Sequence, residues 1–170
     1  MYLSNKDILS EIKKGNLFIS DFNEKYLGQA SYDLALSNEF WVPLKARETI
    51  DVLERTNPNK YMKKVISKYL VLKPGEMCHS LTKEKITLSN GLIGILGGRS
   101  RFARLGVTVH VTSAVVQPGS DNRQILEIVN LSPFTLKLHE GTRLSQIFFE
   151  RLETETNKPY KKFGRIAIKQ

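Results

Sequence analysis

Glu127 is a carboxylate inside an otherwise apolar run, Ile125-Leu126-Glu127-Ile128-Val129, in the second half of the chain. The run is typical of a β-strand, and side-chain alternation puts Glu127 on the same face as Ile125 and Val129. Burial beside apolar neighbours raises the pKa of a carboxyl group, which suits it to accept and donate protons near neutral pH. The residues alone leave two interpretations open: Glu127 is a catalytic acid/base, or it pairs with an arginine in the core.

A second group of reactive side chains combines arginines, a small hydroxyl and glycines between two apolar segments, in Gly97-Gly98-Arg99-Ser100-Arg101-Phe102-Ala103-Arg104. Glycine lets a ligand approach the backbone, and a guanidinium group can bind two phosphate oxygens at once. The segment is therefore suited to phosphate, although basic turns also occur in many proteins without a ligand. It is not a Walker-type loop, because it lacks the Gly-Lys-Ser/Thr ending.

The metal chemistry of the zinc nucleobase deaminases is not available to this chain. Those enzymes hold zinc with one His and two Cys, or with three Cys. Here the single cysteine is Cys78, and the histidines, His79, His110 and His139, show neither Cys-x-x-Cys nor His-x-Glu spacing. We therefore predict no zinc site and no other metal held by protein ligands.

The composition predicts one soluble domain. A chain of 170 residues, 41% hydrophobic and 25% charged, can build one hydrophobic core but not two ordinary domains. We predict a single domain over residues 1–170, with a mobile C-terminal tail from about residue 157. No apolar run is long enough to cross a bilayer. The N-terminus lacks the order of a secretion signal and Cys78 has no disulfide partner, so the expected setting is the cytoplasm.

The formal net charge of +9 favours anionic partners such as nucleic acid, acidic lipid or a phosphorylated small molecule. A nucleic-acid partner is not favoured, because the sequence has no zinc-finger spacing, RNP-like segment or dense basic block. Much of the excess charge is scattered over single or paired lysines, which is typical of a solvated surface: Lys13, Lys14, Lys63, Lys64, Lys68 and Lys83.

These residues must be positioned by a fold that is mainly β. Ser4, Asp7 and Gly15 bracket a short capped amphipathic helix, and the spacing of apolar residues in 59–68 predicts a second helix within a polar insertion. From residue 69 onward, short apolar or alternating runs are separated by turn residues. The expected strands are 71–72, 85–88, 92–96, 107–111, 125–129, 134–138 and 144–149. Closely spaced strands of this kind indicate a distorted β-barrel or a jelly-roll-like sandwich.

The motifs in this order resemble those of the dCTP deaminases, which form one superfamily with the trimeric dUTPases. The resemblance covers nearly the whole chain. It is carried by an N-terminal helix, by the segments 29–34 and 98–106, by 109–112 followed by Pro118-Gly119 and Leu126-Glu127, and by 140–149. It implies a dUTPase-like barrel and homotrimers whose active sites are shared between subunits. It also implies that the nucleotide enters with Mg²⁺ on its phosphates.

Carried over to this sequence, the resemblance assigns roles to several site residues. Glu127 is the implied acid/base, with Ser100 and Arg104 at the reaction centre. Arg99 and Gln146 help to hold the triphosphate, the backbone of 125–127 reads the pyrimidine edge, and Tyr160 belongs to a tail that closes over the nucleotide. The full implied substrate site consists of Arg99, Ser100, Arg101, Phe102, Ala103, Arg104, Gln117, Ile125, Leu126, Glu127, Gln146 and Tyr160.

Three positions depart from the family pattern. Gln117 stands where the family usually has an aspartate, which in dUTPases positions the water that attacks phosphate. A glutamine cannot act as a base, although its amide can still bond to the deoxyribose 3'-hydroxyl. Arg101 and Ser113 replace a serine and an alanine, which could alter phosphate or base contacts.

The sequence therefore favours deamination of dCTP to dUTP and ammonia. The alternative is a dUTP diphosphatase or a bifunctional dCTP deaminase/dUTPase. A third hypothesis is a nucleotide or nucleic-acid binder that has lost the chemistry.

Overall fold

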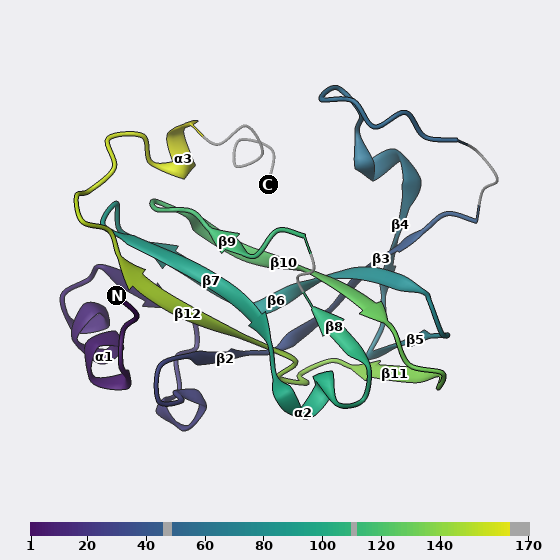
Figure 1. Cartoon of the computed structure of the whole chain (residues 1–170), viewed down its shortest axis with the longest axis horizontal. Helices are drawn as coiled ribbons and strands as arrows, with labels where there is room; N and C mark the ends of the chain where they lie inside the picture. The colour runs from purple at the N-terminus through teal and green to yellow at the C-terminus, as the bar shows by residue number, and fades with distance from the viewer. Residues whose placement is uncertain (46–48, 110–111, 164–170) are drawn as a thin grey trace.

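A computed structural model describes residues 1–45, 49–109 and 112–163 of the chain (Figure 1). In this part of the chain the strands form three sheets rather than a closed barrel, so the fold is mainly β as predicted, but barrel closure is not observed. None of the helices in the described ranges is long and apolar enough to cross a membrane.

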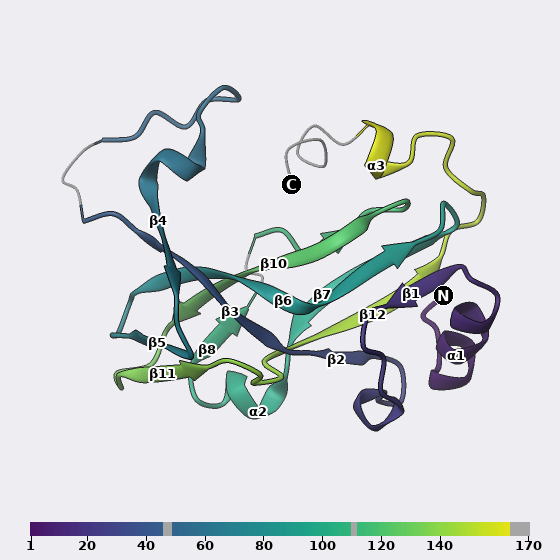
Figure 2. The same cartoon turned by 180° about the vertical axis from the view of Figure 1, so that it is seen from behind.

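The largest sheet has six strands and carries Glu127. Its main path runs β4-β3-β6-β10-β8, and β1 pairs with β6 beside that path. The strands are β1 (Leu17–Ile19), β3 (Leu36–Pro43), β4 (Met62–Ile66), β6 (Met77–Leu88), β8 (Val107–Val109) and β10 (Asp121–Asn130). Figure 2 shows from behind how β6 and β10 run side by side through the molecule.

The second sheet has four strands in the order β2-β12-β7-β9, and the third is a β11-β5 pair. Their bounds are β2 (Tyr32–Leu34), β5 (Tyr69–Leu72), β7 (Leu92–Gly98), β9 (Val115–Val116), β11 (Leu136–His139) and β12 (Ser145–Arg151). Five helical segments complete the described part of the fold: α1 (Asn5–Lys13), η1 (Glu24–Tyr26), η2 (Pro58–Tyr61), α2 (Ser100–Ala103) and α3 (Tyr160–Phe163). Each stretch expected to form a strand contributes at least part of one.

The N-terminal helix α1 begins where the sequence predicts it. The Ser4 hydroxyl accepts from the Asp7 backbone N–H at 3.3 Å, and the Asp7 carboxylate accepts from the Ser4 backbone N–H at 3.1 Å. This reciprocal cap satisfies two backbone donors that have no partner inside the helix. Ile8 in the first half of the helix is fully buried, so capping and burial together fix the helix on the body of the protein.

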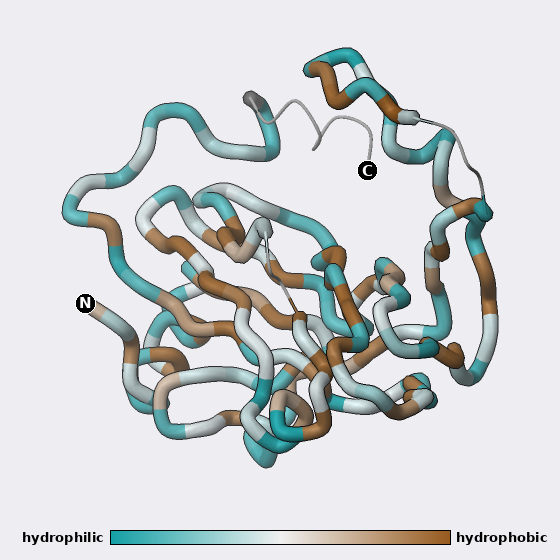
Figure 3. Tube along the Cα trace, turned by 45° about the vertical axis from the view of Figure 1, so that its right-hand side comes forward, coloured by the Kyte–Doolittle hydropathy of each residue, from teal (hydrophilic) through white to brown (hydrophobic). Residues whose placement is uncertain are grey.

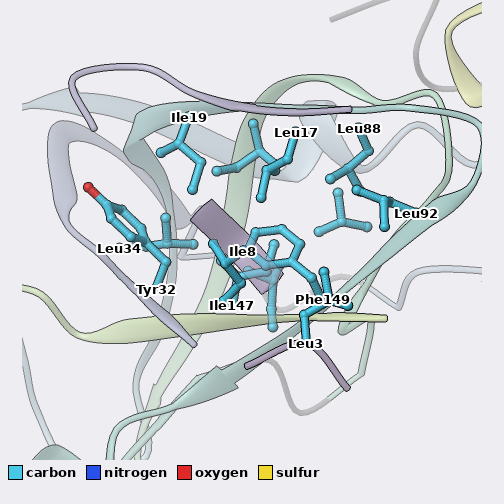
Figure 4. Close-up of a cluster of buried hydrophobic side chains, with 13 residues drawn as sticks. Leu3, Ile8, Leu17, Ile19, Tyr32, Leu34, Leu88, Leu92, Ile147 and Phe149 are labelled. Atoms are coloured by element: carbon cyan, nitrogen blue, oxygen red, sulfur yellow. The ribbon is translucent and has the colours of Figure 1, made fainter. Parts of the chain in front are cut away.

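Two apolar clusters form the core. The first packs α1 against β1, β2, β7 and β12, with Ile8, Tyr32 and Phe149 among its fully buried members (Figure 4). The second lies under the six-stranded sheet and contains Phe40, Leu126 and Ile128. Buried and more exposed residues alternate along β6 and most of β10, as expected for a sheet with one buried face, and hydrophobic and hydrophilic residues are interspersed along the chain trace (Figure 3).

The predicted second helix, residues 59–68, is wrong. One short turn, η2, is followed by strand β4, which pairs antiparallel with β3 so that Val65 lies opposite Phe40. Pairing satisfies the edge backbone groups of β3, and Lys64 Nζ lies 2.6 Å from Glu39 Oε2 and 5.2 Å from the centre of the Trp41 ring. These contacts with a distant strand outweigh a local helical spacing of apolar residues.

Candidate active site

The arginine-rich turn is held in place by a close approach between two loops. β7 ends at Gly98, Arg99 precedes the one-turn helix α2, and the chain then reverses at Gly106, whose φ is +77°. The Gly106 carbonyl accepts from the Leu131 backbone N–H at 2.8 Å. A Cβ at Gly106 would lie 2.6 Å from the Ser132 Cβ, so the loop between β10 and β11 leaves no room for a side chain here.

This geometry predicts that Gly106→Ala destabilises the protein more than Gly141→Ala does. Gly141 also has a positive φ, +79°, but a Cβ there would have no neighbour within 4 Å. Gly141→Ala should therefore lower the free energy of unfolding by about 1 kcal/mol, the left-handed backbone cost alone. Gly106→Ala should lose a further ~1–3 kcal/mol through overpacking. Urea denaturation of both variants checks this, and equal losses would contradict the close approach.

A surface pocket of about 480 Å³ opens between this turn and β8. It is lined by Gly98, Ser100, Ala103, Gly106, Val107, Thr108, Val109, Leu131 and Gln146. Three predicted site residues, Ser100, Ala103 and Gln146, therefore meet around one cavity. The Ser100 and Thr108 hydroxyls and the Gln146 amide are neutral hydrogen-bonding groups of the kind that orient a polar ligand.

Gln146 is held beside the turn by its two neighbours. Its Oε1 accepts from the Ser31 hydroxyl at 2.9 Å, and its Nε2 donates to the Gly98 carbonyl at 3.0 Å. β12 places Gln146 opposite Gly97 on β7 and Asp33 on β2, so three strands converge on this side chain. Ser31 was not among the predicted site residues, although it lies in the segment 29–34 that carries part of the family resemblance.

Arg99 lies next to the pocket but is turned toward β2. Its Nη2 is 2.8 Å from Asp33 Oδ2, and its Nη1 donates to the Arg143 carbonyl at 2.7 Å. Burial raises the pKa of the Asp33 carboxyl, while the nearby Arg99 and Arg143 guanidinium groups favour its charged form. Arg99 is thus already partnered in the described structure and must exchange or share these contacts to reach a phosphate.

The other side chains of the α2 segment are either packed against the core or exposed to solvent. Phe102 packs against the second core cluster, whereas Arg101 and Arg104 are exposed. The Arg104 backbone N–H donates to the Ser100 carbonyl at 3.1 Å, which closes the helical turn. Both guanidinium groups are therefore available to a ligand or to another chain.

Glu127 lies on β10 as predicted, on the same face as Ile125 and Val129. Its neighbours Leu126 and Ile128 are fully buried, so Glu127 points to the outer face of the sheet, where Ile125 is 42% exposed. The carboxylate is half-buried rather than enclosed, and its Oε2 accepts from the Thr112 hydroxyl. No arginine in the described part of the chain forms an ion pair with Glu127. Within those residues, the alternative that Glu127 pairs with an arginine in the core is therefore not supported.

The remaining predicted residues, Gln117 and Tyr160, lie at a different turn, between β9 and β10. Gln117 is exposed, and its backbone carbonyl accepts from the Ser120 hydroxyl at 2.6 Å. The Tyr160 backbone N–H donates to the Pro118 carbonyl at 2.9 Å, and Lys161 Nζ lies 3.0 Å from Asp121 Oδ2. The C-terminal tail therefore packs against this turn at residues 160 and 161, and residues 164–170 lie outside the described ranges.

Within one chain the predicted site is only partly assembled. Ser100, Ala103 and Gln146 line the pocket, but Glu127, Arg104, Gln117 and Tyr160 are not among its lining residues. In the described ranges no group of three or more His, Cys, Asp or Glu side chains gathers as a set of metal ligands. His110, one of the three histidines, lies outside those ranges.

Comparison with known proteins identifies the family. Residues 2–152 match the family model described as dCTP deaminase-like. A dCTP deaminase, dUMP-forming, of Methanosphaera stadtmanae is 32% identical, with 93% of this chain and 83% of the relative covered. A dCTP deaminase of Buchnera aphidicola subsp. Baizongia pistaciae is 36% identical, with coverage of 94% and 89%.

Solved structures show the same fold. The 2'-deoxycytidine 5'-triphosphate deaminase of Agrobacterium tumefaciens matches with a TM-score of 0.69 at 21% identity, over 89% of this chain. This chain spans 49% of that larger one. A dUTPase from phage phi11 of S. aureus matches with a TM-score of 0.53 at 14% identity, over 88% of this chain and 98% of its own. The dUTPase-like fold and the match over residues 2–152 lead to one conclusion: the chain belongs to the dCTP deaminase-like family.

Proposed function

We propose that this protein is a dCTP deaminase, a hydrolase that converts dCTP and water to dUTP and ammonia in the cytoplasm. The observation that carries the proposal is the setting of Glu127. It is a half-buried carboxylate on the outer face of β10, bonded to the Thr112 hydroxyl and free of any arginine ion pair in the described ranges. One relative is named "dCTP deaminase" and another "dCTP deaminase, dUMP-forming", and both names support dCTP as the substrate.

One carboxylate can perform every proton transfer that this reaction needs. Glu127 takes a proton from water as the water oxygen attacks C4 of cytosine, and it passes that proton to ring nitrogen N3. It then takes the proton of the new C4 hydroxyl and delivers it to the departing amino group, which leaves as ammonia. Ser100 and Arg104 orient the water and stabilise the changing charge.

We further propose a homotrimer with shared active sites, because one chain does not complete the site by itself. The pocket that contains Ser100 and Gln146 lacks the acid/base, and Glu127 stands on an open sheet face. Apolar side chains near the pocket are exposed in the single chain: Leu105 is 56% exposed, Leu131 72% and Phe134 69%. Contact with a second chain would cover such side chains and could bring a carboxylate to the pocket.

The triphosphate would enter as its Mg²⁺ complex. Mg²⁺ prefers several oxygen ligands, usually carboxylates, water or phosphates. The pocket lining offers hydroxyl, amide and backbone groups but no carboxylate, so the residues fit a metal that the substrate carries rather than one held by the protein. The bound ion would offset phosphate charge, while Arg99 and Gln146 position the phosphates.

Removing metals should therefore have two different effects. Excess EDTA is expected to reduce dCTP turnover at least about tenfold by stripping Mg²⁺ from the nucleotide, and added Mg²⁺ alone should restore the rate. Zinc-selective dipicolinate, with Mg²⁺ kept in excess, should leave the rate within about twofold, because no zinc water takes part. Ammonia release measures both effects. Loss of activity in dipicolinate, reversed by zinc, would contradict the proposed chemistry.

The product is the second question, since relatives named dUMP-forming match this chain as well as those named dCTP deaminase do. We propose dUTP as the product, because the exposed Gln117 amide cannot serve as a base for phosphate hydrolysis. Formation of dUMP is the alternative that the relatives' names favour.

Chromatography after incubation with dCTP and Mg²⁺ decides between the products. We expect dUTP and ammonia in equal amounts, and separately supplied dUTP should remain intact. Pyrophosphate with dUMP would establish the dUMP-forming reaction. Tight nucleotide binding without any product would instead indicate a non-catalytic binder and would overturn the proposal.

A further inference from the structure

A row of side chains that includes Glu127 crosses the outer face of the six-stranded sheet. The register places Lys64 on β4 opposite Trp41 on β3, Trp41 opposite His79 on β6, and His79 opposite Glu127 on β10. These four strands are adjacent in the sheet, as Figures 1 and 2 both show. The row therefore joins Glu127 to a titratable imidazole that belongs to none of the motifs behind the family resemblance.

The alternation of burial confirms that His79 and Glu127 share a face. Ser80 and Leu126, the next residues along the two strands, are both 0% exposed and point into the core. His79 and Glu127 are half-buried on the other side. Directly opposite residues in an antiparallel pair have Cβ atoms about 4.5–5.5 Å apart, close enough for their side chains to interact.

On this face of the sheet, His79 and Glu127 interact electrostatically with each other. Burial lowers the pKa of the His79 imidazole, and the Glu127 charge opposes that shift. The other charged groups on the face are already engaged, because Glu39 bonds Arg123 Nη1 at 2.7 Å and Lys64 Nζ at 2.6 Å. In the described ranges, the charged residue opposite His79 on β10 is Glu127, and the residue opposite it on β3 is Trp41.

We propose that His79 is a positioning residue that controls when Glu127 can take a proton, and so sets the acid limit of the deamination. The proposal rests on the function proposed above. His79 lies directly opposite Glu127 on the neighbouring strand, and the Thr112 hydroxyl donates to the Glu127 carboxylate. The imidazole touches no reacting atom and works only through Glu127.

The direction of its effect follows from charge. An imidazolium directly opposite Glu127 on the neighbouring strand favours the charged form of that carboxylate. A neutral residue at position 79 removes this electrostatic support from the carboxylate. The enzyme should then lose its base at a higher pH. A permanent cation at position 79 should have the opposite effect.

The kinetic test is the pH profile of kcat/KM for dCTP in the wild type and three variants. For His79→Gln we expect the acid limb to move up by about half a pH unit, an approximately threefold loss at a fixed pH on that limb. For His79→Lys the limb should move down. For His139→Gln, a control on the exposed β11 histidine, it should not move. Equal limbs in all four proteins, or a uniform loss without a shift, would overturn the proposal.

An NMR titration of the His79 imidazole tests the pair without relying on catalysis. By reciprocity, removing the Glu127 charge in Glu127→Gln should lower the pKa of His79 by about half a unit from its wild-type value. An unchanged His79 titration would refute the coupling. If dCTP is not turned over at all, the proposed function fails, and the titration still decides whether His79 and Glu127 act together.

Discussion

Replacing the carboxylate in Glu127→Gln should reduce dCTP turnover by at least about a thousandfold, near the upper part of the range for a general acid/base. The amide has the same size, and its oxygen can still accept from the Thr112 hydroxyl. It cannot take a proton from water, so the attack on C4 loses its base. Rapid-quench measurement of uracil nucleotide at saturating dCTP would record the loss.

The glutamine variant should otherwise behave as the wild type. Its nucleotide affinity should change by less than about threefold, since the phosphate contacts assigned to Arg99 and Gln146 are distant in sequence and untouched. Glu140→Gln is a suitable control because it removes a carboxylate whose partner is the exposed Lys83. It should keep near wild-type turnover. More than a tenth of wild-type activity in Glu127→Gln would exclude Glu127 as the proton carrier.

Arg143→Met should cause the largest loss of stability of any single change in the site's support. Arg143 Nη1 donates to Glu84 Oε1 at 2.8 Å and to the Asp33 carbonyl at 2.6 Å, and the guanidinium carbon lies 3.2 Å from the centre of the Tyr26 ring. Glu84 is only 3% exposed. Without Arg143 its charge is buried and unpaired, which costs about 3–5 kcal/mol.

Urea denaturation at neutral pH measures the loss in free energy of unfolding, and a variant that breaks a surface ion pair serves as the comparison. Lys83→Met breaks the exposed contact with Glu140 and should cost about 1 kcal/mol or less. The double variant Arg143→Met/Glu84→Leu should recover part of the loss, because no charge remains buried. A cost for Arg143→Met no larger than that for Lys83→Met would show that the pair does not stabilise this region.

Local signals in the sequence were sufficient for some of the fold. Ser4 and Asp7 fix the start of α1 through contacts three residues apart, and this prediction is confirmed. The alternation around Glu127 correctly gives its strand and its face. The prediction of a helix over 59–68 was wrong because residues 62–66 form β4 by pairing with the edge of β3. The local spacing of apolar residues contains no information about that distant partner.

The candidate site was harder to predict because strand register decides it. The pairing of His79 with Glu127 depends on how β6 and β10 align, and their register shifts between Arg123 and Ile125. A one-residue change would turn the imidazole to the other face. Motif order did identify Ser100 and Gln146, which meet at the pocket, but it gave no indication that Asp33 would bind Arg99.

The most direct test of the account is the fate of the oxygen atom during turnover of dCTP in ¹⁸O-labelled water with Mg²⁺. Mass spectrometry should find dUTP that carries one ¹⁸O, at O4 of uracil, and none in its phosphates. This is the outcome of water attack at C4 with no phosphate hydrolysis. Recovery of unlabelled dCTP alone would contradict the proposed deamination, and label in pyrophosphate or in the phosphate of dUMP would contradict dUTP as the final product.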